Sequence, residues 1–322
     1  MLIKFLITTS IVFNSLTSLA VDLNSSFNDF PELKFNKIVK EKVEKTPLSP
    51  DWQFQKAAIL AIEQALPNFL PIRNWGIDNP EIEARASLIL DLEKDKILYQ
   101  ENIDKVLPIA SLTKLTTALV VLENIDQNEV VQISERAIAG YGERGGLFLD
   151  EEITVRNLLH ALLMESSNDA AHALAEAVEK ETGRDFIELM NEKVKGLGLK
   201  ETKFIDPSGY SPENVSNVYE LSQIVKASFK EPLIWEIMKT PMIELFSTDR
   251  KIRHYWINTD KLLSRLNNVI GGKTGYTEEA KGCLILVVQE DNGPLISVVL
   301  GADERFLETE RLINWVKKAY QW

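Results

Sequence analysis

Cysteine and histidine are scarce in this chain of 322 residues, which has one cysteine and three histidines. A single thiol forms no disulfide within the chain, and we expect Cys283, in the apolar run 283–288, to be a buried structural thiol. No histidine forms a ligand pair with Cys283 at the spacing of known metal sites. The sequence therefore predicts no metal site and no cofactor.

Glycine, proline and positive charge are also limited. The 15 glycines and 12 prolines exclude collagen-like and low-complexity chains, and the 45% of hydrophobic residues is typical of a globular protein. The 36 lysines and arginines are outnumbered by 48 aspartates and glutamates, which gives a net charge of −12. An acidic chain without an evident basic patch repels a phosphate backbone, so no nucleic acid partner is expected.

The N-terminus has the pattern of a signal peptide over residues 1–20. Lys4 is the only charge, an apolar stretch covers 5–13, and the segment ends in Ser18-Leu19-Ala20. This pattern predicts export to the periplasm or the extracytoplasmic face of the cell membrane. The apolar stretch is shorter than the roughly 20 residues that span a bilayer, which favours cleavage over an uncleaved anchor. Membrane contact is expected only if the segment is retained.

The remaining chain divides into a tether and a domain. Residues 21–50 are polar and mixed in charge and end in a proline-rich cluster, which indicates a disordered linker or tether. Residues 51–322 are expected to form the domain, beginning with an amphipathic helix from Asp51 that Pro67 ends.

Hydrophobic periodicity predicts two kinds of element within the domain. We expect helices over about 111–122, 155–163, 171–178, 186–194 and 303–320, and strands over 87–92, 96–99, 271–277, 282–289 and 295–300. Strands at both ends of the chain with helices between them predict an α+β fold. We expect a mostly antiparallel five-stranded sheet flanked by terminal helices, a helical lobe at about 108–245, and a cleft between them.

Three short motifs fall at element boundaries in this domain. They are Ser111-x-x-Lys114, Ser166-x-Asn168 and Lys273-Thr274-Gly275. The first two patterns each occur about once by chance in a chain of this length, and the third in about one chain in ten. Their order, context and spacing, with 55 residues from Ser111 to Ser166 and 107 from Ser166 to Lys273, carry the signal.

These motifs resemble those of the low-molecular-mass penicillin-binding proteins, which are serine-type D-alanyl-D-alanine carboxypeptidases and their endopeptidase relatives. The resemblance covers roughly residues 80–320 and includes the segments 108–114, 167–171, 271–277 and 298–302. It implies a β-lactamase/DD-peptidase-like fold over residues 51–322. It also implies peptidoglycan stem peptides as substrates and β-lactams as covalent inhibitors.

The residue chemistry fits an acyl-enzyme mechanism on Ser111. Lys114 lies one helical turn after Ser111, so its amine can reach the hydroxyl. Burial and the second cation Lys273 would lower the pKa of Lys114, which makes it the candidate general base. We also expect Ser111 to open a helix whose N-terminus favours developing negative charge.

The other two motifs are expected to bind and orient the substrate. The resemblance implies that Ser166 carries a proton to the leaving nitrogen and that Asn168 binds the substrate backbone. Both residues can also cap the following helix.

The third motif is expected on the edge of the sheet. On that strand Lys273 and Thr274 would bind a terminal carboxylate, and Gly275 would let the substrate lie close. The N–H groups of Tyr276 and Ser111 would form an oxyanion hole.

The sequence leaves several activities open. The carboxypeptidase is favoured, and an endopeptidase of cross-links is the main alternative. A β-lactamase-like hydrolase is disfavoured, because Glu201 lacks the asparagine four positions later that a class A enzyme would have. A non-catalytic wall-binding module is disfavoured by the intact motifs. His172 is expected to be a core or half-buried histidine rather than a catalytic base.

Overall fold

The computed structural model describes residues 70–139 and 146–322. The expected signal peptide, the tether and the helix from Asp51 lie outside the described residues. Within these ranges no helix combines the length and the apolar character that crossing a membrane would require.

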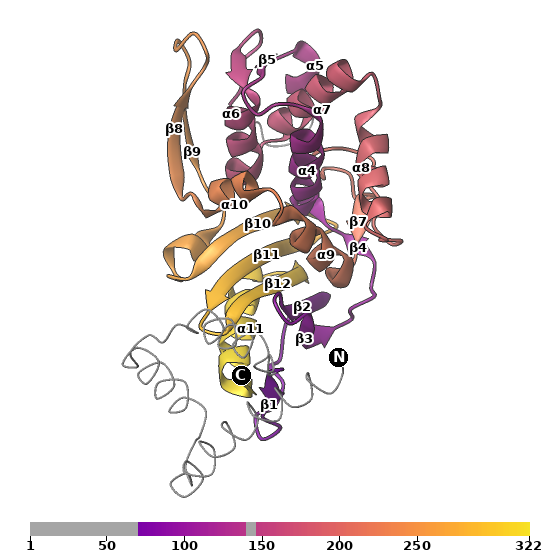
Figure 1. Cartoon of the computed structure of the whole chain (residues 1–322), viewed down its shortest axis with the longest axis vertical. Helices are drawn as coiled ribbons and strands as arrows, with labels where there is room; N and C mark the ends of the chain where they lie inside the picture. Colours follow the sequence, from indigo (N-terminus) through magenta and orange to yellow (C-terminus); the bar gives the residue numbers. More distant parts are fainter. Residues whose placement is uncertain (1–69, 140–145) are drawn as a thin grey trace, which may run out of the picture. The chain divides into compact units, whose positions relative to one another are not determined.

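A five-stranded antiparallel sheet forms the centre of the domain (Figure 1). Its order is β10-β11-β12-β2-β3, so strands from the two ends of the described chain pair with each other, as β2 does with β12. This arrangement confirms the predicted α+β fold with its antiparallel five-stranded sheet. The bounds are β2 Ala86–Asp91, β3 Lys96–Glu101, β10 Val269–Thr277, β11 Lys281–Glu290 and β12 Gly293–Ala302.

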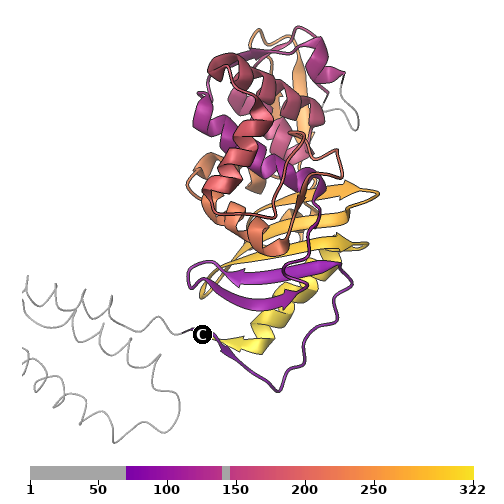
Figure 2. The same ribbon diagram turned by 90° about the vertical axis from the view of Figure 1, so that its right-hand side faces the viewer.

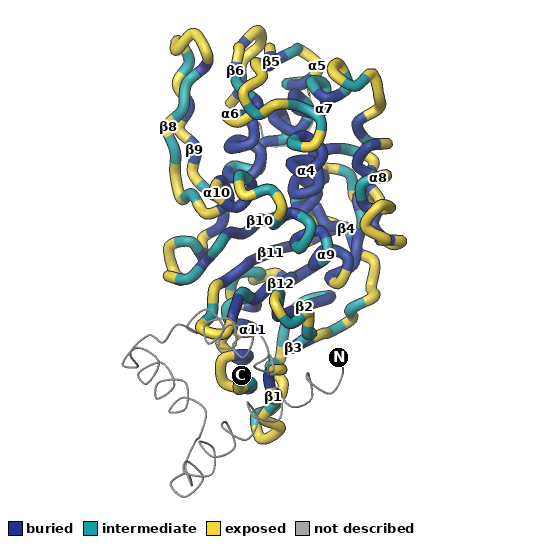
Figure 3. The backbone as a smooth tube through the Cα atoms, in the orientation of Figure 1, coloured by how far each residue is buried: buried dark blue, intermediate teal, exposed yellow. Residues whose placement is uncertain are grey.

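The sheet is buried on both faces, and this explains the nearly continuous apolar runs of its central strands (Figure 3). Along β2, Leu88 and Leu90 join the core shared with the helical lobe, whereas Ile89 joins a second core on the other face. In β11, Ile285 faces the first core and Leu284 faces the second. The period of two therefore distributes one apolar run between two cores.

Helices cover the two faces separately (Figure 2). The C-terminal helix α11, Arg305–Ala319, packs on β11 and β12 through Leu312 and Val316. The opposite face is covered by α9, Val218–Ser228, and α10, Pro232–Lys239. A short ladder joins β1, Ile72–Arg73, to β13, Tyr320–Gln321, beside the end of α11.

The helical lobe is built around α4, whose residues from Lys114 to Val121 are all buried. The neighbouring elements of this part of the chain pack around α4 or connect it to the sheet, and the bounds that follow include α4. Their bounds are β4 Leu107–Pro108, η1 Ala110–Thr113, α4 Lys114–Asn124, β5 Val130–Gln132, α5 Glu135–Ile138, β6 Glu152–Thr154, α6 Val155–His160, η2 Ala161–Glu165, α7 Asn168–Thr182, α8 Phe186–Gly196 and β7 Val215–Ser216.

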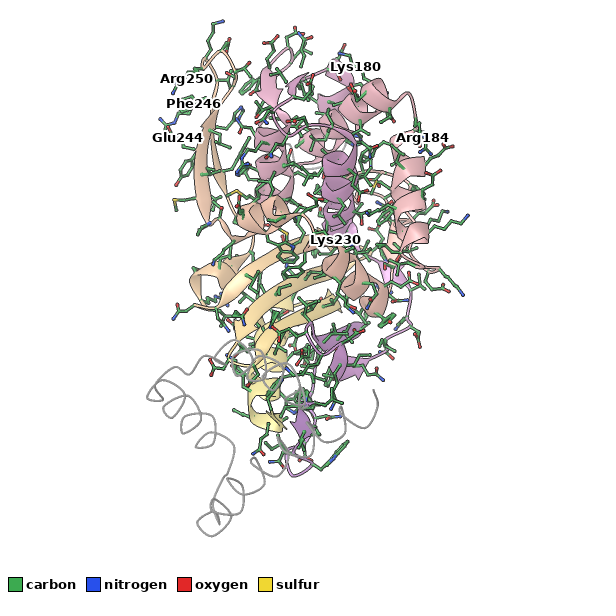
Figure 4. The ribbon with its side chains drawn as sticks, in the orientation of Figure 1. Lys180, Arg184, Lys230, Glu244, Phe246 and Arg250 are labelled. Carbon is green, nitrogen blue, oxygen red and sulfur yellow. The ribbon has the colours of Figure 1, made fainter. Side chains whose placement is uncertain are left out.

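A hairpin that the periodicity did not predict leads from the lobe toward the third motif. It consists of β8, Met242–Phe246, and β9, Arg253–Ile257, and the short helix η3, Lys261–Ser264, follows it. The hairpin stands beside the helical lobe, and Glu244, Phe246 and Arg250 lie along its outer side (Figure 4). The hydrophobic periodicity predicted only helices between the two groups of strands, so it missed this hairpin. Only one face of the hairpin is buried, and its strands therefore lack the continuous apolar runs of the sheet strands.

Cys283 lies in β11 as a free and fully buried thiol, as the sequence predicts. Burial raises its pKa to about 11. We therefore expect the folded chain to resist alkylation by iodoacetamide at neutral pH, because the reactive thiolate is both inaccessible and disfavoured. Intact-mass measurement should show one added group only after unfolding in guanidinium, and rapid native labelling would contradict this assignment.

Candidate functional site

A cleft of about 530 Å³ lies where the edge strand β10 faces the helical lobe. The cleft brings together residues from all three sequence motifs. Lys114 and Lys273, which are 0% and 1% exposed, lie beneath its surface. The lining side chains belong to Ser111, Glu165, Ser166, Asn168, Tyr210, Pro212, Thr259, Thr274, Gly275, Tyr276, Thr277, Glu278, Glu279 and Arg305.

Lys114 makes three hydrogen bonds through its amine. Nζ donates to Ser111 Oγ at 2.9 Å, to Asn168 Oδ1 at 2.7 Å and to the Ser208 carbonyl at 2.6 Å. The amide oxygen of Asn168 and the carbonyl of Ser208 can only accept hydrogen bonds. A neutral amine that keeps these two bonds must therefore turn its lone pair toward the Ser111 hydroxyl. This geometry makes Ser111 the group that Lys114 can deprotonate.

The surroundings of the amine make its neutral form accessible near neutral pH. Burial lowers the pKa of Lys114 to about 7, although the Asp206 carboxylate opposes this shift. The local backbone differs from expectation, because Ser111 lies inside the 3₁₀ turn η1 and the α-helix begins only at Lys114. Because η1 runs directly into α4, Ser111 still lies in the first turn of the helical segment, near the end that was expected from the sequence to favour negative charge.

The turn that supplies the Ser208 carbonyl is organised by Asp206. Its Oδ1 accepts from Ser208 N and Oγ and from Gly209 N, each at 2.7 Å, and its Oδ2 accepts from Ser211 N at 2.9 Å. Burial raises the pKa of Asp206, but these hydrogen bonds outweigh burial and hold it below its ordinary value. The carboxylate therefore fixes the turn against Lys114.

Gly209 packs the same turn against Ala110, the residue before Ser111. Its φ is +78°, and a Cβ there would lie 2.0 Å from the Ala110 carbonyl oxygen. Ala110 is itself left-handed at φ 48°. Only glycine satisfies both the backbone angle and the close approach.

Ser166 lies on the facing wall after the π-helical turn η2. Its left-handed backbone, φ 64° and ψ 33°, ends that turn and directs the chain into α7. The expectation that Ser166 and Asn168 cap this helix was wrong, because Ser167 is the N-cap and its Oγ accepts from Ala170 N at 3.0 Å. Neither Ser166 nor Asn168 is therefore needed as the cap.

Lys273 connects the edge strand to this wall. Its Nζ donates to Ser166 Oγ at 2.8 Å and to the Thr274 carbonyl at 2.9 Å. Burial lowers the pKa of Lys273 well below its ordinary value, with further contributions from Lys114 and Arg305. Thr274 Oγ1 lies 2.7 Å from Thr259 Oγ1 in a hydrogen bond.

Gly275 brings the strand close to Ser111. A Cβ at this position would lie 3.0 Å from the backbone nitrogen of Ser111. The segments that carry the Ser111 and Tyr276 amides are therefore adjacent, as the predicted oxyanion hole requires. The Tyr276 side chain itself is 54% exposed at the cleft rim.

Arg305 and Thr259 are site residues that sequence reasoning missed. Arg305 begins α11, lines the cleft and donates to the Gly275 carbonyl at 3.4 Å. Thr259 follows the unpredicted hairpin. Neither residue belongs to a recognisable motif, so only the folded arrangement reveals them.

Two residues considered from the sequence lie outside the cleft lining. Glu201 is exposed and does not line the cleft. His172 is half-buried on α7, and burial lowers its pKa. This position agrees with the prediction of a half-buried histidine. Among residues 70–139 and 146–322, no group of three or more potential ligands is arranged to hold a metal ion.

Comparison with known proteins identifies the family of this fold and cleft. Residues 74–304 match the family described as Peptidase_S11, D-alanyl-D-alanine carboxypeptidase. The chain belongs to this carboxypeptidase family. The match confirms the resemblance inferred from the three motifs.

The relatives of this chain are named for two different activities. The chain is 32% identical over 249 residues to the D-alanyl-D-alanine carboxypeptidase DacF of Bacillus subtilis, covering 74% of this chain and 63% of that protein. It is 34% identical over 249 residues to the D-alanyl-D-alanine endopeptidase of Escherichia coli, covering 74% and 78%. The chain thus spans less than two thirds of the Bacillus relative.

A solved structure supports the fold assignment. The Streptomyces K15 DD-transpeptidase superposes with a TM-score of 0.69 at 28% identity, covering 75% of this chain and 100% of that one. The predicted fold class is confirmed.

The burial of Lys114 predicts a pH dependence for this family member. A base must be neutral to accept a proton, so the rate constant for acylation of Ser111 by a penicillin should rise with pH up to about 7. Below that pH the rate should fall about tenfold per unit. Stopped-flow or quenched acylation at a series of pH values tests this, with circular dichroism as the control for folding. A rise of the rate constant centred near the ordinary lysine pKa would contradict the assignment of Lys114 as the general base.

The close approach of Gly209 predicts a measurable loss of stability. Gly183 also has a positive φ, +68°, but a Cβ there would meet nothing within 4 Å, so Gly183→Ala is a matched control. Gly209→Ala should lower the free energy of unfolding by about 1–3 kcal/mol more than Gly183→Ala, because only the first variant is overpacked. Urea unfolding followed by fluorescence compares them, and equal losses would refute the proposed clash.

Proposed function

We propose that this chain is an exported serine DD-peptidase that cleaves D-alanyl-D-alanine bonds of peptidoglycan stem peptides. The single observation that supports this most strongly is the buried Lys114 amine, which is 2.9 Å from the Ser111 hydroxyl and held by two acceptor-only groups. A lysine in this position serves as a general base without histidine or metal.

The reaction begins with acylation. Ser111 Oγ attacks the carbonyl carbon of the penultimate D-alanine, and its proton passes to Lys114 Nζ. The oxyanion accepts hydrogen bonds from the N–H groups of Ser111 and Tyr276. The carbon–nitrogen bond then breaks as Ser166 delivers a proton to the leaving nitrogen and receives the one that Lys114 took, so the Lys114 amine is neutral again. Water attacks the resulting ester and gives a proton to Lys114, which returns it to Ser111 Oγ as the ester carbon–oxygen bond breaks.

The substrate is held by the two walls of the cleft. Asn168 binds the peptide backbone from the helical side, and the edge strand around Gly275 binds it from the other side. Lys273 and Thr274 bind the terminal carboxylate, to which the Arg305 guanidinium adds positive charge.

The carboxypeptidase reaction is the favoured activity, because these cationic groups suit a free C-terminal D-alanine. The alternative is the endopeptidase reaction on cross-links. One observation supports it, because the chain covers a larger share of the Escherichia coli endopeptidase than of the Bacillus carboxypeptidase. Both reactions release an amine from the same acyl-enzyme and therefore share the residues named above.

Product analysis on defined muropeptides tests the activity. The full chain should release D-alanine from a monomeric pentapeptide and should form a stable adduct with penicillin on Ser111, found by peptide mapping. Both results follow from attack by the same hydroxyl. Cleavage of cross-linked dimers without release of D-alanine would instead establish the endopeptidase.

Ser111→Ala is the control, and it should abolish both the turnover and the adduct. Labelling that persists in this variant, or an unmodified wild-type chain, would refute the acyl-enzyme on Ser111. Steady-state hydrolysis of nitrocefin would assign a β-lactamase, since a peptidase stops after about one turnover. Binding to cell wall without turnover or adduct would indicate a non-catalytic module.

A further inference from the structure

Asp260 is a buried carboxylate behind the third motif. It lies between β9 and β10 and is 3% exposed. One of its oxygens has a structural role, because Oδ1 accepts from Leu262 N at 2.9 Å and caps η3. The Asp260 backbone N–H is also satisfied, by Asn258 Oδ1 at 2.9 Å.

The second oxygen has no such role. Oδ2 is buried and accepts no hydrogen bond from the described residues. It lies against Gly272, where an added Cβ would be only 2.4 Å away. Gly272 immediately precedes Lys273, so the unpartnered oxygen packs against the backbone that carries the buried amine. A buried polar atom without a partner is unfavourable, and serine could cap η3 without it.

Lys273 is the group that gains from this negative charge. Its hydrogen bonds go to neutral oxygens of Ser166 and Thr274. Burial and the cations Lys114 and Arg305 all disfavour its protonation, and the Asp260 carboxylate opposes them. The protonated form of Lys273 is therefore favoured by a charge that Lys273 does not contact through a hydrogen bond.

Two opposing influences set the pKa of the Asp260 carboxyl. Burial raises its pKa to about 6, while the Leu262 N–H, Lys273 on β10 and Arg305 on α11 lower it. Asp260 is thus mostly ionised at neutral pH and can exert its charge on Lys273 there.

We propose that Asp260 is a positioning residue that keeps the Lys273 ammonium charged from behind the strand, so that the cleft retains a cation for the substrate carboxylate. This inference rests on the proposed function for its consequence, because Lys273 must be protonated when Lys114 is neutral. The two lysines lie in one cleft and repel each other's charge. Asp260 acts as the group that separates their protonation states.

Lysine NMR tests the inference without relying on activity. The Cε resonance of Lys273, assigned with Lys273→Arg, is titrated in the full chain and in Asp260→Asn. Asparagine keeps an oxygen for Leu262 N but removes the charge. The titration midpoint of Lys273 should fall by about one pH unit, as expected for loss of a nearby opposite charge. An unchanged midpoint would overturn the proposal.

Acylation kinetics test the consequence for binding. The rate constant for benzylpenicillin, which carries a carboxylate, should be lower in Asp260→Asn than in the wild-type chain, with a deficit that grows with pH toward a limit of about tenfold above both Lys273 midpoints and shrinks at lower pH. The methyl ester of the same penicillin lacks the anion and should react equally with both chains. Equal losses for acid and ester, or parallel pH profiles, would show that Asp260 acts on the fold or the nucleophile instead.

Asp91→Asn is the matched control, because Asp91 is also fully buried and caps a turn by accepting from Lys94 N at 2.9 Å. It should leave the Lys273 midpoint and the pH profile unchanged.

Asp260→Ser, which keeps a capping oxygen, replaces Asp260→Asn if that variant does not fold. Failure of both to fold would assign Asp260 a purely structural role and reject the proposal. Absence of a wild-type adduct would refute the proposed function separately, since the NMR comparison does not depend on it.

Discussion

The burial of two lysine amines beneath one cleft is the constraint on which this structure depends. A buried ammonium is unfavourable unless hydrogen bonds and charge compensate for lost hydration. Lys114 is placed among acceptors that tolerate either protonation state, while Lys273 bridges the strand and the helical wall. The two amines are thus both buried but have different partners.

Several strained or crowded backbone features maintain these surroundings. Left-handed backbones at Ala110 and Ser166 place the two hydroxyl-bearing segments on either side of the cleft. Non-glycine residues in this conformation are unfavourable by about 1–3 kcal/mol each, so the packed lobe must enforce them. The rigid turn at Gly209 and the buried face of β10 provide that support.

Local sequence predicted the parts of the site that depend on spacing. The Ser111 and Lys114 contact follows from their separation by one turn, and the strand assignments follow from apolar runs. The contact of Lys273 with Ser166 spans 107 residues and could be expected only through the family resemblance. Arg305 and Asp260 reach the site through tertiary packing alone.

The errors have equally specific causes. The left-handed backbone of Ser166 ends η2, so the next residue, Ser167, occupies the N-cap position of α7. The β8–β9 hairpin escaped notice because its strands are short and bury one face only. Each strand has only five residues, and its buried side includes a polar residue, His254, which pairs with Leu245. The alternation of apolar and polar residues is therefore too short to indicate a strand.

The edge position of β10 has a consequence for the solubility of the protein. Exposed sheet edges can pair with other extended chains, and many proteins protect them against aggregation. Here the helical lobe lies along this edge, because η1 packs against β10 and Ser166 accepts a hydrogen bond from Lys273. The lobe that completes the cleft therefore also shields the strand that would otherwise be open to edge-to-edge pairing.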